Sequence, residues 1–207
     1  MSRVAVADLG LGNLGSVLQA IVRAGGEPRL ASRADEIARA ERVIVPGVAA
    51  FGLGMERAGA LGLRDALRKA LDRKTPVLGI CLGMQILFEE GEEDGVRPGL
   101  RLLPGRVTRI PDGVQVPHIG WQQLVWSSES ALAKGGQKPL WAYFANSYRC
   151  EAPAQLTHAI ADHSGVSIAA VVGQGTLFGV QFHPEKSAKD GEELLARFLR
   201  LPPGAPA

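Results

Sequence analysis

A cysteine lies between two glycines at a point where the chain changes from a strand-like to a helix-like pattern. Cys81 has Gly79 two residues before it and Gly83 two residues after it, in the order Gly-x-nucleophile-x-Gly. This spacing is typical of a sharp strand-to-helix turn that presents a nucleophile, and tight turns need small residues. The start of the following helix favours a thiolate and leaves backbone N–H groups for a developing oxyanion. Cys81 is therefore a candidate nucleophile; the alternative is a buried cysteine in a glycine-rich turn.

A histidine and a glutamate two residues apart could complete a catalytic triad. A cysteine nucleophile needs a nearby base and a group that orients the base. His183 ends an apolar strand-like segment, and Pro184 holds it extended. Residues two apart in an extended chain lie on one side, so Glu185 can accept the second ring N–H of His183. The pattern predicts a Cys81–His183–Glu185 triad, although His-Pro-Glu alone is also typical of an ordinary turn after a strand.

The other three histidines fit a catalytic role less well. His158 and His163 flank a polar turn beside Asp162, and we expect both of their rings to be solvated. His118 follows Pro117 in a strand-like segment, where it could serve either the fold or an interface. The base of the predicted triad is therefore assigned to the histidine of the His-Pro-Glu segment.

A second glycine-rich segment, residues 10–15, has the spacing Gly-x-Gly-x-x-Gly between a predicted strand and a predicted helix. That spacing is typical of dinucleotide-binding loops. Asp8 would oppose a pyrophosphate there, and the second predicted strand ends without an acidic residue for a ribose, although Ser32 and Arg33 could suit a phosphorylated one. A non-catalytic nucleotide-binding or regulatory module stays open as an alternative to a tight loop at the edge of a sheet.

Strands and helices alternate over the first 90 residues. Strands are expected at 3–7, 27–31, 42–46 and 75–78, and helices at 16–24, 32–40, 63–72 and 84–90. Ser32 and Asp35 resemble a capping box at the start of the second helix. This alternation predicts an α/β fold with a doubly wound, mostly parallel central sheet and helices on both faces. Ligands bind beyond the carboxyl ends of such strands, so the loop at 8–15, the loop at 46–54 and the Cys81 turn should share one edge.

The second half of the chain has short strand-like segments after a polar loop that begins at Gly91. They are expected at 106–110, 114–116, 124–126, 141–148, 156–161, 167–172 and 177–182, the last two as a hairpin, before a closing helix at 190–200. No linker separates this half from the first, so we expect an antiparallel β extension of the same domain. One domain is predicted over residues 1–201, followed by a disordered tail over residues 202–207.

Composition places the chain among ordinary globular proteins. Its 207 residues are 46% hydrophobic and 21% charged, and the net charge of +2 gives no reason to expect nucleic acid as a partner. No apolar run approaches the roughly 20 residues of a membrane span, and no secretory leader is visible, so a cytoplasmic location is expected. Cys81 and Cys150 are too few for a disulfide framework or a metal site, and a reducing compartment suits a thiol nucleophile.

Several separated segments together resemble the class I (triad) glutamine amidotransferases. The class is indicated by Pro-Gly-Val at 46–48, by residues 79–85 and by Gln-Phe-His-Pro-Glu-Lys-Ser at 181–187. Within the class the chain resembles the glutaminase subunits of imidazole glycerol phosphate synthases. This narrower resemblance rests on residues 8–13, 46–52, 117–121 (Pro-His-Ile-Gly-Trp) and 143–148 (Tyr-Phe-x-x-Ser-Tyr).

The resemblance implies an enzyme of histidine biosynthesis that hydrolyses L-glutamine to glutamate and ammonia, with no cofactor and no metal. Cys81 would attack the substrate's amide carbon, His183 would move the protons, and Glu185 would fix the ring. The oxyanion and substrate contacts that the resemblance implies are carried by Gly47, Val48, Leu82, Gln85, Ser147 and Tyr148.

The resemblance also implies a partner, a (β/α)₈ barrel cyclase subunit that forms a heterodimer with this chain and receives the ammonia. The cyclase would make imidazole glycerol phosphate and an aminoimidazole carboxamide ribotide. Asn13, Trp121 and Lys186 are the candidates for the face that contacts it. A glutaminase subunit serving anthranilate or pyridoxal phosphate synthesis is the alternative, and the segment 117–121 argues against it.

Three residues depart from the family pattern. Ala49 stands where the oxyanion loop usually ends in glycine, and a Cβ at that position restricts a backbone flip. Asn146 stands in place of a usual histidine, and Gln122 in place of a usual asparagine. None of the three belongs to the predicted triad, so the expected activity is unchanged, whereas loop gating and partner contacts stay open.

Overall fold

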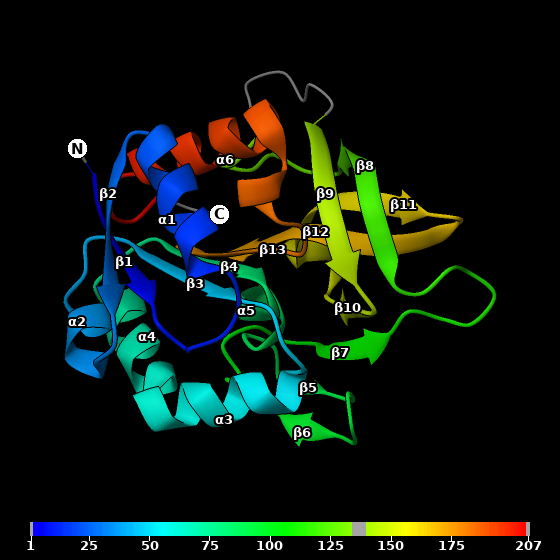
Figure 1. Cartoon of the computed structure of the whole chain (residues 1–207), viewed down its shortest axis with the longest axis horizontal. Helices are drawn as coiled ribbons and strands as arrows, with labels where there is room; N and C mark the ends of the chain where they lie inside the picture. Colours follow the sequence, from blue (N-terminus) through cyan, green and yellow to red (C-terminus); the bar gives the residue numbers. More distant parts are fainter. Residues whose placement is uncertain (1, 134–139, 206–207) are drawn as a thin grey trace.

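The computed structural model describes residues 2–133 and 140–205, and within them the core is a nine-stranded sheet (Figure 1). Its strand order is β2-β1-β3-β4-β13-β12-β11-β8-β9. The pairs from β2 to β13 are parallel, and those from β13 to β9 are antiparallel. The strands are β1 (Ser2–Ala7), β2 (Gly26–Ala31), β3 (Val43–Gly47), β4 (Val77–Cys81), β8 (His118–Trp126), β9 (Leu140–Asn146), β11 (Thr157–His163), β12 (Val166–Gln174) and β13 (Leu177–Val180). The predicted parallel sheet with an antiparallel extension is confirmed.

Helices cover both faces of the parallel half of the sheet (Figure 1). On one face lie α1 (Leu14–Arg23) and α6 (Ala188–Arg200), and on the other lie α2 (Ala34–Ala38), α3 (Phe51–Leu61) and α4 (Leu63–Asp72). None of the helices in the described residues has the length and apolar character needed to cross a membrane.

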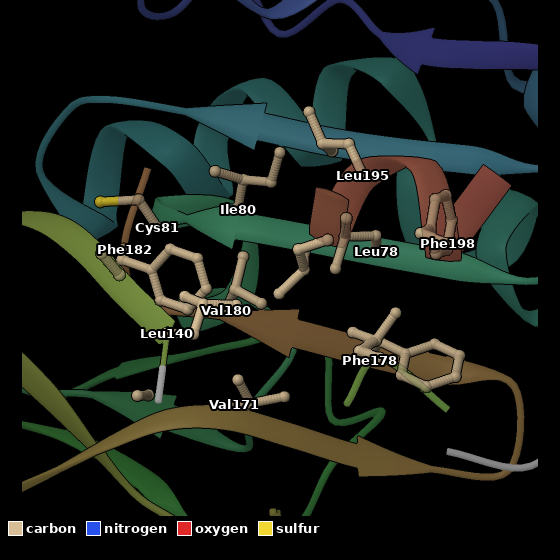
Figure 2. Close-up of a cluster of buried hydrophobic side chains, with 14 of the residues drawn as sticks. Leu78, Ile80, Cys81, Leu140, Val171, Phe178, Val180, Phe182, Leu195 and Phe198 are labelled. Atoms are coloured by element: carbon tan, nitrogen blue, oxygen red, sulfur yellow. The ribbon is translucent and has the colours of Figure 1, made fainter. Parts of the chain in front are cut away.

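Alternation along each strand supplies an apolar surface to both layers of helices. On β4, Leu78 and Ile80 belong to the core that contains α6, whereas Val77 belongs to the core that contains α4. Figure 2 shows Leu195 and Phe198 of α6 packed over this β4 surface and its neighbours on β13. Each side chain of this size contributes about 1.5–3 kcal/mol when it is fully buried. These two cores fix β4 at the centre of the sheet.

The helix that was predicted at residues 84–90 is wrong, because α5 (Leu82–Gln85) ends after one turn. The carbonyl groups of Ile86, Leu87 and Phe88 accept hydrogen bonds from the N–H groups of residues 100–103 instead of continuing a helix. All three side chains are fully buried. A neighbouring loop therefore supplies the backbone partners that a longer helix would have provided for itself.

A second, four-stranded sheet in the described part of the chain was not predicted. Its order is β10-β7-β5-β6, with β5 (Glu90–Gly91), β6 (Arg97–Pro98), β7 (Arg106–Arg109) and β10 (Tyr148–Glu151). The expected polar loop after Gly91 thus includes a short hairpin, and the strand expected at 114–116 is absent from the structure. Strands of two to four residues give too little alternation for a sequence pattern to detect.

Two details of the first half also differ from the prediction. The loop expected at 46–54 ends at Ala50, because α3 begins at Phe51. Glycines at 52, 54 and 59 lower the helix propensity of this segment, so the start of α3 was not predicted. The second helix is capped by Glu36 instead of Asp35, since the Glu36 carboxylate accepts the N–H groups of Ser32 and Arg33 at 3.1 and 3.2 Å. Asp35 pairs with the Arg33 guanidinium.

Part of the predicted tail lies against the domain. The Gly204 N–H donates to the Lys74 carbonyl at 2.9 Å, and Ala205 packs against the core that contains α1 and α6. Residues 206 and 207 lie outside the described part of the chain. The boundary at residue 201 stays a prediction.

The histidines expected to be solvated are buried. His158 and His163 are 5% and 8% exposed, and both lie on β11, which has β12 and β8 as its neighbours in the sheet. The His118 ring lies between His163 and Phe144, with ring centroids 4.0 and 4.7 Å away. Neither ring nitrogen of His118 has a hydrogen-bond partner among the described residues. Burial, with a smaller contribution from His163, lowers the pKa of His118 to about 4.

We expect the free energy of unfolding to fall as the pH drops from about 6.5 to about 4, because of His118. The folded ring stays neutral down to about pH 4, whereas an unfolded histidine takes up a proton near 6.5, so acid favours the unfolded chain in this window. The full pKa difference corresponds to about 3 kcal/mol. Urea unfolding at about pH 7 and pH 4.5 should show a smaller loss for His118→Phe, which keeps the ring stack, than for wild type. Equal losses would contradict this assignment.

Candidate active site

Cys81 ends β4 in a strained backbone conformation. Its φ of 53° and ψ of −110° are dihedrals that residues with a side chain rarely adopt, and α5 begins at the next residue. A Cβ on Gly83 would lie 1.7 Å from the Val45 carbonyl oxygen, and one on Gly79 would lie 2.5 Å from the Gly83 carbonyl oxygen. Both glycines of the motif are therefore required by backbone packing, and the predicted strand-to-helix turn is present.

His183 and Glu185 form an ion pair beside this turn. His183 Nδ1 lies 2.8 Å from Glu185 Oε1, and their side chains are only 2% and 6% exposed. Because β13 runs parallel to β4, with Val180 opposite Ile80, the residues after both strands emerge at one edge of the sheet. Interactions with the Cys81 side chain are among the causes that raise the pKa of His183, so the sulfur lies beside the ring. The structure thus brings the three residues of the predicted triad together.

The surroundings of His183 favour its charged form. Burial on its own would lower the pKa of His183, but hydrogen bonds to Cys81 and Glu185 and the negative charges of both outweigh burial and raise the pKa to about 10. The ring therefore holds a proton near neutral pH. An imidazolium beside a thiolate can supply a proton to a leaving group once the sulfur has attacked.

The oxyanion-loop candidates lie next to the turn. Gly47 is opposite Cys81 in the parallel pairing of β3 with β4, and a Cβ on Gly47 would lie 3.1 Å from a Leu82 methyl group. Val48 follows the strand and is 53% exposed. The loops at 8–15 and 46–50 and the Cys81 turn therefore meet at one edge of the sheet, since a Cβ on Gly12 would lie 3.1 Å from the Val48 nitrogen.

The Gly-x-Gly-x-x-Gly loop uses its backbone N–H groups internally. The Asp8 carboxylate accepts the Gly10 N–H at 2.9 Å, and the Asn13 side chain accepts the Ser16 N–H at 3.2 Å as the N-cap of α1. A phosphate at this helix start would compete with both side chains. The loop geometry favours close packing against Val48 over nucleotide binding.

Three candidates for substrate contact lie on α5 and at the junction of β9 with β10. Gln85 is buried, and its Nε2 donates to the Tyr148 carbonyl at 3.2 Å. Ser147 lies between β9 and β10 and is half-buried, as is Tyr148. The side-chain Nδ2 of Asn146, one of the departures from the family pattern, donates to the same Tyr148 carbonyl at 3.1 Å. Asn146 therefore supports the segment that carries Ser147 and Tyr148.

The three interface candidates lie near one another, and Tyr143 connects two of them. The Trp121 and Tyr143 ring centroids are 6.0 Å apart, and the Lys186 Nζ lies 5.8 Å from the Tyr143 centroid. Asn13 and Lys186 both line a cavity of about 30 Å³ that is also lined by His183. The other two departures, Ala49 and Gln122, are half-buried on the loop after β3 and on β8.

Two further residues of the site were missed from the sequence, although both lie in the segment 181–187. The Gln181 Nε2 lies 3.8 Å from the Cys81 sulfur. The Ser187 hydroxyl donates to the His183 carbonyl at 2.6 Å and accepts the Tyr143 N–H at 2.9 Å, which holds the backbone of the base. The signal for Gln181 was its spacing two residues before His183. Within the described residues no group of three or more His, Cys, Asp or Glu side chains is arranged to hold a metal ion.

The fold and the site define a class of protein. The family model for class I glutamine amidotransferases matches residues 6–201, and the chain belongs to that family. Two solved structures share the fold: one described as a glutamine amidotransferase (TM-score 0.73, 22% identity, covering 95% of this chain and 96% of that one), and PurLQS from Thermotoga maritima (TM-score 0.74, 21% identity, covering 96% and 98%). At these identities the likeness concerns the fold alone.

Within this family, the chain is similar to curated relatives named imidazole glycerol phosphate synthase subunit HisH. The HisH subunit of Symbiobacterium thermophilum is 44% identical over 202 residues, covering 97% of this chain and 95% of the relative. That of Moorella thermoacetica is 41% identical over 201 residues, covering 97% and 96%. The family prediction made from the motifs is confirmed, and the chain is an enzyme of this class rather than a nucleotide-binding module.

Proposed function

We propose that this chain is the glutaminase subunit of an imidazole glycerol phosphate synthase and hydrolyses L-glutamine to glutamate and ammonia. The observation that carries the proposal is the buried His183–Glu185 ion pair beside the Cys81 sulfur. A thiolate in a strained turn, a charged imidazole and an orienting carboxylate are the parts that acyl transfer from an amide needs. The HisH relatives support glutamine as the amide and histidine biosynthesis as the pathway.

The first half-reaction forms a thioester. The Cys81 thiolate attacks the side-chain amide carbon of glutamine, and the carbonyl oxygen takes up the negative charge. The backbone N–H of Leu82 would stabilise this oxyanion, joined by that of Val48 after a rearrangement of the loop at 46–50. The His183 imidazolium then gives its proton to the amide nitrogen, the C–N bond breaks, and ammonia leaves.

The second half-reaction releases glutamate. Neutral His183 takes a proton from a water molecule, whose oxygen attacks the thioester carbon. The C–S bond breaks, so the Cys81 thiolate and the His183 imidazolium are restored. Glu185 accepts the Nδ1–H throughout, which keeps Nε2 directed at the reacting atoms. Gln85, Ser147 and Tyr148 would hold the amino-acid end of the substrate.

The chemistry of ammonia explains why a partner subunit is needed. In water it is largely protonated and has no lone pair to attack with, so it must be passed directly to the subunit that uses it. We propose a (β/α)₈ barrel cyclase as this subunit, making imidazole glycerol phosphate and an aminoimidazole carboxamide ribotide. Asn13, Trp121 and Lys186 would face the cyclase, and Tyr143 joins them through its contacts with Trp121 and Lys186.

Glutamine hydrolysis measured with and without the cyclase subunit tests the proposed function. We expect little turnover by the isolated chain and a marked rise when the cyclase is added. Robust turnover by the isolated chain would contradict the coupling, and no turnover in either case would contradict the proposal. Pulldown by the cyclase, compared with pulldown by an anthranilate or pyridoxal phosphate synthase subunit, separates the proposed complex from the alternative amidotransferases.

Glu185→Gln is expected to lower kcat by roughly 10³-fold and to leave the KM for glutamine nearly unchanged. The variant keeps the shape of the side chain but loses the charge that supports the His183 imidazolium. Its amide can also donate to Nδ1, which stabilises the wrong ring tautomer. Steady-state glutaminase kinetics in the cyclase complex measure the effect. A kcat within tenfold of wild type would show that Glu185 does not orient the base.

A further inference from the structure

A buried glutamine approaches the Cys81 sulfur from the same segment that supplies the base. Gln181 has no solvent exposure, and its Nε2 lies 3.8 Å from the sulfur. Gln181 stands two residues before His183, and Phe182 between them belongs to the apolar core that contains Cys81 (Figure 2). The sulfur thus has both an imidazole and an amide from one short stretch as neighbours.

The orientation of this amide is set by a chain of hydrogen bonds that begins at a backbone carbonyl. The Tyr148 carbonyl can only accept, so Gln85 must direct its Nε2 toward it. The same Nε2 donates to the Gln181 Oε1 at 3.2 Å, which leaves the Gln181 Nε2 directed at the sulfur. No flipped arrangement of either amide satisfies all of these partners.

Cys150 reinforces this orientation through a second contact with the amide oxygen. Its sulfur lies 3.9 Å from the Gln181 Oε1. Burial raises the pKa of Cys150 well above its usual value, with a further contribution from the charge of Cys81, so this thiol keeps its proton and acts as a donor. Two donors therefore meet the Gln181 oxygen, and its N–H group is the one that remains for Cys81.

We propose that Gln181 is a positioning residue that holds the Cys81 sulfur through an N–H···S hydrogen bond and favours its thiolate form. The inference rests on the proposed function, in which Cys81 is the nucleophile. A hydrogen bond donated to a thiolate stabilises the charged form over the thiol, because the thiol is a much weaker acceptor. The relay also connects the sulfur to Gln85, so the side chain expected to contact the substrate and the nucleophile share one buried network.

Alkylation of Cys81 by iodoacetamide tests this role without requiring glutamine turnover. Mass spectrometry of the Cys81 peptide gives the rate across pH 5–9 for the full chain and for Gln181→Met, which keeps the side-chain length but cannot donate. We expect the profile to move to higher pH, with alkylation at pH 6 slowed roughly threefold to tenfold. Gln174→Met, at the exposed end of β12, is the matched control and should leave the profile unchanged.

An unchanged Cys81 profile in a folded Gln181→Met variant would overturn the proposal. If methionine prevents folding, Gln181→Glu provides the second test, since its carboxylate still accepts from Gln85 but repels a thiolate. Alkylation at pH 8 should then be slowed, and a wild-type rate would overturn the proposal equally. The two failures are distinguishable. If the Gln181→Met profile shifts but the wild-type chain does not hydrolyse glutamine with the cyclase, the role of Gln181 is supported and the proposed function is rejected.

Discussion

Cys81→Ala is expected to lower glutamine hydrolysis in the proposed cyclase complex by at least about 10⁴-fold. The methyl group cannot form the thioester, and His183 loses the negative neighbour that helps to hold its proton. Water would have to attack the amide directly, aided only by the oxyanion-binding N–H groups and by substrate binding. Discontinuous measurement of glutamate release, with the substrate well above its KM, is sensitive enough to detect this loss.

Added ammonium salt provides the control for this variant. If Cys81→Ala removes only the nucleophile, the complex should still make the cyclase products from external ammonia at the wild-type rate, because folding and docking are unaffected. Loss of the ammonia-dependent rate would show that the substitution damaged the complex. Glutamine hydrolysis within tenfold of wild type would contradict the assignment of Cys81 as the nucleophile.

Gly83→Ala is expected to abolish folding or to cost more than about 4 kcal/mol, at the far end of the range for single substitutions. The added Cβ would lie 1.7 Å from the Val45 carbonyl oxygen, which belongs to a central strand and cannot move away. Separating β3 from α5 by more than 1 Å would open the packing around Cys81 as well. Soluble yield and urea unfolding report the loss.

Gly59→Ala is the matched control. Gly59 lies in α3, and a Cβ placed on it would have nothing within 4 Å. Alanine in a helix interior is favoured over glycine by roughly 0.5–1 kcal/mol, so this variant should be slightly more stable than wild type. A Gly83→Ala chain that unfolds at the same urea concentration as Gly59→Ala would show that the turn tolerates a side chain.

The triad could be predicted from the sequence because local rules govern each of its parts. Glycines two residues on either side of Cys81 indicate a turn too tight for side chains, and 1.7 Å at Gly83 is the physical reason. His183 is extended as predicted, but Glu185 reaches its ring from a short 3₁₀ helix, η2 (Pro184–Lys186), and not from an extended segment. Alternating strands and helices then placed both segments at one edge, since parallel strands end together.

Features that depend on distant parts of the chain could not be predicted. The one-turn length of α5 follows from hydrogen bonds between residues 86–88 and 100–103, which no local pattern reveals. The burial of His163 follows from the pairing of β11 with β12 across a turn that looks polar. The orientation of the Gln181 amide depends on its hydrogen bond with Gln85, which in turn is oriented by the Tyr148 carbonyl. Both residues are distant from Gln181 in the sequence.

The position of β13 means that the chain cannot be split into two fragments near this strand without separating the parts of the active site. The strand has β4 as its parallel neighbour and β12 as its antiparallel neighbour, so it joins the two halves of the sheet. A fragment that stopped before residue 177 would keep its thiol but lack both the base and the middle of its scaffold. Split-enzyme reporters and circular permutants should therefore be cut elsewhere, and any permutation has to keep residues 177–187 continuous.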